Sequence, residues 1–169
     1  MRNWKWLAVS LILLLLVVAC SESGAAAPQG VNTGNVARDF TLETVEGNNV
    51  SLKDHRGQVL LINFWATWCP PCRAEIPDLQ STYLERREDG FVVLGVNVEE
   101  SRAQVQQFMD EVEMTYPVLL DEGGEVIQTY RANGLPMSVL VDSEGVIRVR
   151  HVGYLTAGQL EDYLAELLP

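Results

Sequence analysis

A pair of cysteines at the junction of an apolar run and a helical segment constrains this chain more than any other feature. The run 59–66 reads Val-Leu-Leu-Ile-Asn-Phe-Trp-Ala, and Cys69-Pro70-Pro71-Cys72 follows shortly after it. Nearly continuous apolar residues predict a strand that is buried on both faces. A helix that begins here would place the Cys69 thiol beside free N–H groups and the positive end of the helix dipole, which stabilise a thiolate. Cys72 could then form a disulfide and release a bound partner, which is thiol–disulfide exchange.

Length and charge narrow the choice of partners. The 169 residues predict one domain with an appendage. Acidic residues outnumber basic ones by 23 to 12, so the net charge is −11. An excess of negative charge argues against nucleic acid or an anionic membrane surface as an electrostatic partner. We therefore expect a soluble, acidic domain surface.

The N-terminus has the pattern of an export signal. Arg2 and Lys5 precede an apolar stretch, 7–19, that only Ser10 interrupts. This stretch is shorter than the roughly 20 residues that a membrane-spanning helix needs. It fits the apolar region of a secretory signal peptide instead.

The end of this segment resembles the lipobox of bacterial lipoproteins. It reads Val17-Val18-Ala19-Cys20, and in such proteins the cysteine is acylated after cleavage of the signal. An ordinary signal peptide and an uncleaved anchor are the alternatives. We expect a signal peptide over 1–19, a flexible tether over 20–35 that starts at lipidated Cys20, and a folded domain over 36–169.

The domain reads as an α/β protein with a mixed central sheet flanked by helices. In chain order the predicted elements are a β-hairpin over 40–52 around the turn 46–49, a strand over 59–66, a helix over 70–88, a strand over 91–98, a helix from 101, a strand over 117–120, a helix over 124–130, strands over 137–141 and 146–152, and a helix from 156. Strands that alternate with helices, followed by an antiparallel pair, are typical of such a sheet.

The segment 63–77, Asn-Phe-Trp-Ala-Thr-Trp-Cys-Pro-Pro-Cys-Arg-Ala-Glu-Ile-Pro, resembles the TlpA/ResA-like branch of the thioredoxin fold. The resemblance implies a thioredoxin fold with an N-terminal β-hairpin and a central β-α insertion over 96–120. It also implies a membrane-anchored, extracytoplasmic (periplasmic) thiol–disulfide oxidoreductase. Such a protein needs no cofactor beyond its redox-active disulfide, here Cys69–Cys72.

The same resemblance assigns roles to individual residues. Cys69 matches the attacking cysteine and Cys72 the resolving one. Gly134-Leu135-Pro136 matches the loop whose cis-proline faces the disulfide, so that the Leu135 backbone could pair with an extended substrate segment. For Trp68, apart from the resemblance, we expect packing around the site, and it is also a candidate contact for a partner.

Two positions depart from the pattern or need a further argument. The family commonly has Thr after the cis-proline, whereas this chain has Met137-Ser138, which leaves the substrate-facing surface open. Asn63 replaces the buried acid of minimal thioredoxins, so another group must handle the Cys72 proton. Glu75, which lies about one helical turn after Cys72, is the nearest candidate for that acid–base work. The alternative for Glu75 is a solvated carboxylate on the helix surface.

The two prolines between the cysteines bear on the direction of electron flow. Neither Pro70 nor Pro71 has an N–H group to donate to the Cys69 thiolate. Fewer donors mean a less stabilised thiolate and a more stable disulfide. This favours a reductant, with a potential nearer to the thioredoxin value of about −270 mV than to the strong oxidant's value of about −120 mV.

Other uses of the cysteines fit less well. A zinc site needs about four ligands, and the only histidines, His55 and His151, lie outside any ligand-spaced motif. A peroxidase of the peroxiredoxin type would need Thr67 in a Pro-rich loop, but a strand precedes it. A copper metallochaperone would favour Cys-X-X-X-Cys with a distal histidine. We therefore predict no metal at this site.

The expected activity is reduction of disulfides in exported proteins. In relatives the substrates include apocytochrome c, so cytochrome c maturation is one candidate pathway. The exported compartment supplies no glutathione buffer, so a membrane electron donor would have to re-reduce the Cys69–Cys72 disulfide.

Overall fold

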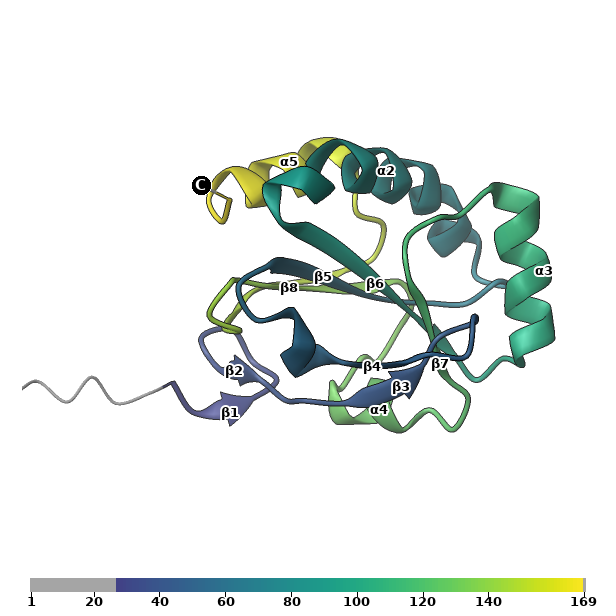
Figure 1. The fold of residues 1–169 in the computed structure, drawn as a ribbon, viewed down its shortest axis with the longest axis horizontal. Helices are drawn as coiled ribbons and strands as arrows, with labels where there is room; N and C mark the ends of the chain where they lie inside the picture. Colours follow the sequence, from purple (N-terminus) through teal and green to yellow (C-terminus); the bar gives the residue numbers. More distant parts are fainter. Residues whose placement is uncertain (1–26, 169) are drawn as a thin grey trace, which may run out of the picture.

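The computed structural model describes residues 27–168, and a five-stranded mixed sheet forms its centre (Figure 1). The strands are β5 (Val59–Trp65), β6 (Phe91–Val98), β7 (Val118–Asp121), β8 (Met137–Val141) and β9 (Ile147–Val152). Their order across the sheet is β7-β6-β5-β8-β9. Strands β5, β6 and β7 are parallel, whereas β8 runs antiparallel to both β5 and β9. The predicted α/β class with a mixed sheet is confirmed.

Helices and short strands cover the two faces of the sheet (Figure 1). One face carries α2 (Pro70–Arg86), α3 (Arg102–Val112) and α5 (Ala157–Ala165), with Leu79, Phe108 and Leu160 in the shared core. The other face carries α4 (Glu125–Thr129) and the hairpin of β3 (Thr41–Glu43) and β4 (Asn49–Ser51). Two 3-10 turns, η1 (Leu52–His55) and η2 (Arg87–Asp89), complete the fold. Burial on both sheet faces accounts for the apolar strand sequences.

Strand β5 occupies the middle of the sheet and positions the cysteines. All seven of its residues are buried. Its side chains alternate between the two cores, with Leu61 and Trp65 on the α2 face and Ile62 and Phe64 on the opposite face. The chain therefore leaves the sheet at its centre, and Cys69 becomes the N-cap of α2.

The N-terminal segment is attached to the domain further upstream than the sequence predicted. Strand β1 (Gln29–Gly30) pairs in parallel with β2 (Val36–Ala37). Beyond β1, the Gly34 N–H donates to the Ile147 carbonyl at 2.8 Å, and the Ile147 N–H donates to the Asn35 carbonyl at 2.9 Å. Within residues 29–35, expected to be part of a flexible tether, Gln29 and Gly30 thus pair with β2, and Gly34 and Asn35 bond to Ile147 at the start of β9. The predicted signal peptide and Cys20 lie outside the described residues.

None of the helices within residues 27–168 has the length and apolar character that a membrane span requires.

Candidate active site

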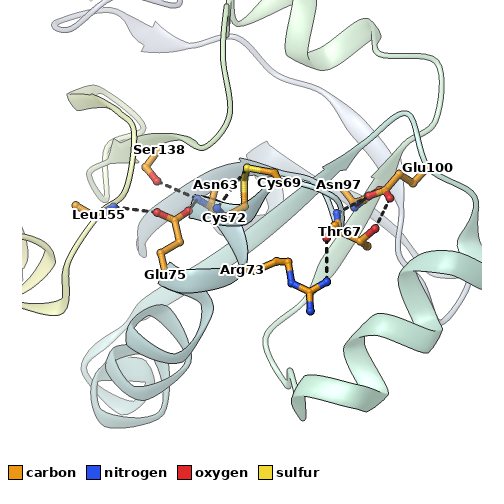
Figure 2. Close-up of a disulfide and its surroundings, with 10 residues drawn as sticks. All are labelled: Asn63, Thr67, Cys69, Cys72, Arg73, Glu75, Asn97, Glu100, Ser138 and Leu155. Atoms are coloured by element: carbon orange, nitrogen blue, oxygen red, sulfur yellow. Dashed lines mark hydrogen bonds between the residues drawn. A yellow bond between two sulfur atoms is a disulfide. The ribbon is translucent and has the colours of Figure 1, made fainter.

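The two cysteines form a disulfide at the N-terminus of α2 (Figure 2). Both are buried, with Cys69 3% exposed and Cys72 fully covered. The Cys72 N–H donates to the Cys69 Sγ at 3.3 Å. Because Pro70 and Pro71 occupy the first two helical positions and carry no N–H, this amide is the first in α2 that can reach the sulfur. The site therefore offers Cys69 a helix terminus but few hydrogen-bond donors.

Glu75 lies beneath the disulfide and is not a solvated carboxylate. It is fully buried, and its Oε1 accepts a hydrogen bond from Asn63 Nδ2 at 2.8 Å. Its Oε2 accepts one from the Leu155 N–H at 2.9 Å. Burial raises the pKa of Glu75 to about 7, and the hydrogen bonds from Leu155 and Asn63 oppose that rise. A group with such a pKa can accept or donate a proton at neutral pH.

Ser138 completes the polar cluster around Glu75. The Asn63 side chain also donates to Ser138 Oγ at 3.1 Å, and the two residues lie opposite one another in the β5–β8 pairing. Ser138 is fully buried, so the departure from the family's Thr changes the interior of the site and not its surface. A lone polar residue in an otherwise apolar strand, facing the polar Asn63, is the sequence signal for this contact.

Two of the three predicted substrate-contacting residues line one groove. The Leu135–Pro136 peptide bond is cis, as expected, and Trp68 is 68% exposed. Trp68 and Leu135 both line a groove of about 520 Å³ that runs towards α4 and also carries Glu99 and Arg131. Apolar residues next to an exposed tryptophan, which directly precedes Cys69, offer a surface where a peptide segment can lie.

A second polar cluster lies on the other side of the disulfide, and sequence reasoning missed it (Figure 2). Its centre is the carboxylate of Glu100, which is only 7% exposed. It accepts hydrogen bonds from the Thr67 N–H at 2.7 Å, the Thr67 hydroxyl at 2.5 Å and Asn97 Nδ2 at 2.8 Å. Arg73 donates to the Thr67 carbonyl at 3.3 Å. The available signal was the polar Asn97 at the end of β6, because adjacent parallel strands end at the same edge of a sheet.

Thr67 and His151 are the residues that a peroxidase or a copper site would use together with the cysteines. The Thr67 hydroxyl donates to Glu100, and His151 Nε2 faces the Tyr154 carbonyl at 3.1 Å. Across residues 27–168, no three side chains of His, Cys, Asp or Glu come together in a way that could hold a metal ion.

Comparison with known proteins agrees with this geometry. The AhpC/TSA family model matches residues 33–150. The thiol-disulfide oxidoreductase ResA of Bacillus thuringiensis subsp. konkukian (strain 97-27) is 33% identical over 164 residues, which cover 93% of this chain and 95% of the relative.

Solved structures give the same result. A thiol:disulfide interchange protein of the thioredoxin family from Chlorobium tepidum TLS superposes with a TM-score of 0.72 at 29% identity, over 79% of this chain and 95% of the other. The pneumococcal exposed lipoprotein thioredoxin Etrx1 from Streptococcus pneumoniae strain TIGR4 has a TM-score of 0.69 at 31% identity, over 77% of this chain and 100% of the other. The fold is therefore thioredoxin-like, and the extent of these matches shows that the chain belongs to the AhpC/TSA family as a thiol–disulfide oxidoreductase of the ResA type.

Proposed function

We propose that this oxidoreductase works as a reductant of disulfides in exported proteins, held at the extracytoplasmic face of a membrane by lipid on Cys20. The observation that carries the direction of the reaction is the donor-poor surrounding of Cys69. Pro70 and Pro71 supply no N–H, and only the Cys72 amide reaches the Cys69 sulfur within α2. A thiolate with few donors is less stable, so the disulfide is favoured and the dithiol gives up its electrons readily.

The reaction runs in two exchange steps. The Cys69 thiolate attacks a substrate disulfide, one substrate sulfur leaves as a thiolate, and a mixed disulfide joins the two proteins. Cys72 then loses its proton to Glu75 and attacks the Cys69 Sγ, which releases the second substrate thiol. Two electrons have passed to the substrate, and the Cys69–Cys72 disulfide has formed. A dithiol donor in the membrane must return two electrons before the next cycle.

Glu75 suits the second step because of its position and its acidity. It lies about one helical turn from Cys72 on α2, and its raised pKa of about 7 lets it take up the thiol proton near neutral pH. Hydrogen bonds from Asn63 and Leu155 keep the carboxylate in place.

The substrate would bind as an extended segment beside Cys69. The Leu135 backbone, next to the cis peptide of Pro136, would pair with that segment, and Trp68 would cover its side chains. Unfolded exported proteins with a pair of oxidised cysteines present such segments, and apocytochrome c belongs to this class. A role in cytochrome c maturation is therefore part of the proposal.

The membrane anchor rests on the lipobox-like sequence that ends at Cys20. The Streptococcus pneumoniae relative is itself described as an exposed lipoprotein. More than one acyl chain is needed for stable attachment. Mass spectrometry of the membrane-bound protein should find an acylated N-terminal Cys20, and Cys20→Ala should release the chain from the membrane fraction.

Trapping with Cys72→Ser tests the reaction and its substrates together. Without the resolving thiol, the mixed disulfide on Cys69 should persist, and mass spectrometry should identify exported proteins with paired cysteines. The control Cys69→Ser keeps a buried thiol at Cys72 and should hold none of them. Equal capture by both variants would contradict the assigned order of attack.

The reduction potential tests the direction. Equilibration against a thiol–disulfide buffer should give a value near about −270 mV, and a value near about −120 mV would make the protein an oxidant instead.

A further inference from the structure

The Glu100 carboxylate is nearly buried and accepts hydrogen bonds on both of its oxygens. It is 7% exposed and accepts three hydrogen bonds. One oxygen takes the Thr67 N–H and Asn97 Nδ2, and the other takes the Thr67 hydroxyl. Two of the three donors therefore belong to one residue, Thr67, which lies directly before Trp68 and Cys69.

Thr67 is held at every polar atom that it has. Glu100 binds its N–H and its hydroxyl, and the guanidinium of Arg73 donates to its carbonyl at 3.3 Å. The same guanidinium lies 4.9 Å from the centre of the Phe108 ring. These contacts fix the short segment through which β5 leads into the N-cap of α2 (Figure 2).

The backbone next to Glu100 is bent in a way that few residues adopt. Glu99 has a φ of 57°, a left-handed conformation that is unfavourable for residues other than glycine. Its N–H donates to the Asp121 carbonyl at 3.1 Å. The bend directly after β6 lets the next side chain, Glu100, reach the end of β5. Strained backbone of this kind is retained where a side chain must be placed accurately.

We propose that Glu100 is a positioning residue for disulfide exchange, acting through Thr67 to hold Cys69 in line for attack by Cys72. It touches neither sulfur. The inference depends on the exchange chemistry alone and holds whichever way electrons flow.

The need for such a residue is greatest in the mixed disulfide. At that stage the Cys69–Cys72 bond is absent, and the Cys69 sulfur is instead bonded to a substrate whose movements can displace it. The Thr67 contacts then keep the backbone before Cys69 fixed while Cys72 attacks the Cys69 sulfur. This attack forms the Cys69–Cys72 disulfide again, and we call it ring closure. Misplacement of reacting atoms by about 1 Å can cost up to about 100-fold in rate, so a loosened segment should slow ring closure more than the first attack.

An aromatic disulfide, dithiobis(nitrobenzoate), separates the two steps in the full-length reduced protein. Attack by Cys69 breaks the probe's S–S bond and releases one coloured thiolate. Attack by Cys72 on the mixed disulfide releases the second thiolate and its own proton, so the probe gains the two electrons that the cysteine pair loses. At high probe concentration the first step is fast, and the second release reports ring closure.

The expected results follow from the donors that each variant leaves unpaired. Glu100→Ala should slow ring closure about tenfold and change the first step by less than about twofold. Glu100→Gln keeps one acceptor oxygen and should fall between this variant and the wild type. Thr67→Val loses only the hydroxyl contact and should slow closure about threefold. Glu122→Gln removes an exposed carboxylate elsewhere and should match the wild type.

The double variant decides whether Glu100 acts through Thr67. In the Glu100→Ala background, Thr67→Val should add less than about 1.5-fold, because the shared contact is already gone. Multiplied effects, or equal slowing of both steps, would overturn the proposal. Thr67→Val provides the test should Glu100→Ala fail to fold, and thermal melts of the oxidised proteins check folding. Failure of the wild type itself to release a second thiolate would instead contradict exchange at this site.

Discussion

Two buried carboxylates flank the disulfide, and they are held in different ways. Glu75 accepts one N–H from a side chain and one from the backbone, and burial raises its pKa to about 7. Glu100 accepts three donors, two of them from the residue that precedes Trp68 and Cys69. Burial brings the pKa of Glu75 close to neutral pH against the effect of its hydrogen bonds, which suits proton transfer at Cys72. The Glu100 contacts hold Thr67 in the segment before Cys69, which suits the placement of Cys69.

The comparison also shows how the site is tied to the sheet. The Glu75 cluster joins α2 to β5, β8 and the loop before α5 through Asn63, Ser138 and Leu155. The Glu100 cluster joins the end of β5 to the end of β6. Both clusters therefore share β5, but one extends to β8 and the other to β6.

The largest expected effect is that of Glu75→Gln on ring closure. In the wild type the rate should rise as the pH passes about 7, because the base form of Glu75 then accumulates. Loss of this base should slow closure at pH 7 by about 100-fold and abolish that inflection. The second thiolate release, followed against pH, measures it. Glu85→Gln, on the same helix, is the matched control, since Glu85 is exposed and its contact is with the Ser81 hydroxyl. An unchanged dependence of the ring-closure rate on pH in Glu75→Gln would contradict the proton-transfer role of Glu75 and thus the separate roles of the two carboxylates.

The same pKa predicts how stability depends on pH. The Glu75 carboxyl keeps its proton up to about pH 7 in the folded protein but loses it near pH 4.5 once unfolded. The folded state therefore binds the additional proton in this window, and the free energy of unfolding falls as the pH rises through it. The expected loss is about 3 kcal/mol. Urea unfolding of the oxidised protein at pH 5 and pH 8 should show this loss in the wild type and not in Glu75→Gln. Parallel pH dependence in both proteins would contradict the buried, protonated carboxyl.

Ser138→Ala tests the far end of the Glu75 cluster. The change leaves one Asn63 N–H without its acceptor in a buried site, so the free energy of unfolding should fall by about 1–2 kcal/mol. Ser143→Ala, in the exposed turn after β8, should change it by less than about 0.5 kcal/mol. Chemical denaturation of both variants makes the comparison, and equal values would mean that the Ser138 hydroxyl adds nothing to the cluster.

The smallest effect should come from Arg73→Lys on the Glu100 side. Arg73 is exposed and reaches the Thr67 carbonyl at 3.3 Å. Lysine keeps the charge but not the planar fork, so stability should change by less than about 0.5 kcal/mol. Ring closure should change by less than about twofold, far less than with Glu100→Ala. A larger effect would show that the exposed guanidinium, and not the buried carboxylate, holds Thr67.

Local patterns predicted the parts of the molecule that depend on neighbouring residues. The buried strand β5, the helix that follows the cysteine pair, and the helices expected from 101 and 156 all appear where the sequence placed them. The position of Glu75 near Cys72 followed from helical spacing, and its burial excludes the alternative of a solvated surface carboxylate, whereas its acid–base role stays a proposal.

Contacts between distant segments could not be predicted in the same way. Glu100 reaches Thr67 from the next strand, and Ser138 reaches Asn63 across the β5–β8 pair. Such contacts depend on strand order and register, which one sequence does not specify. The N-terminal segment was misplaced for a related reason. Its Ser, Gly and Ala residues suggest a linker, yet its backbone hydrogen bonds to Ile147 hold it on β9.

That attachment has a practical consequence for any shortened version of the protein. A fragment that begins at Val36 would remove the Asn35 carbonyl and leave the Ile147 amide without its acceptor. It would also free the backbone at the start of β9 for pairing with another copy, and unpaired sheet edges are a common cause of aggregation. A fragment that begins before Pro28, whose carbonyl accepts the Val36 N–H, keeps the segment that bonds to Ile147. Such a fragment should be monodisperse in solution.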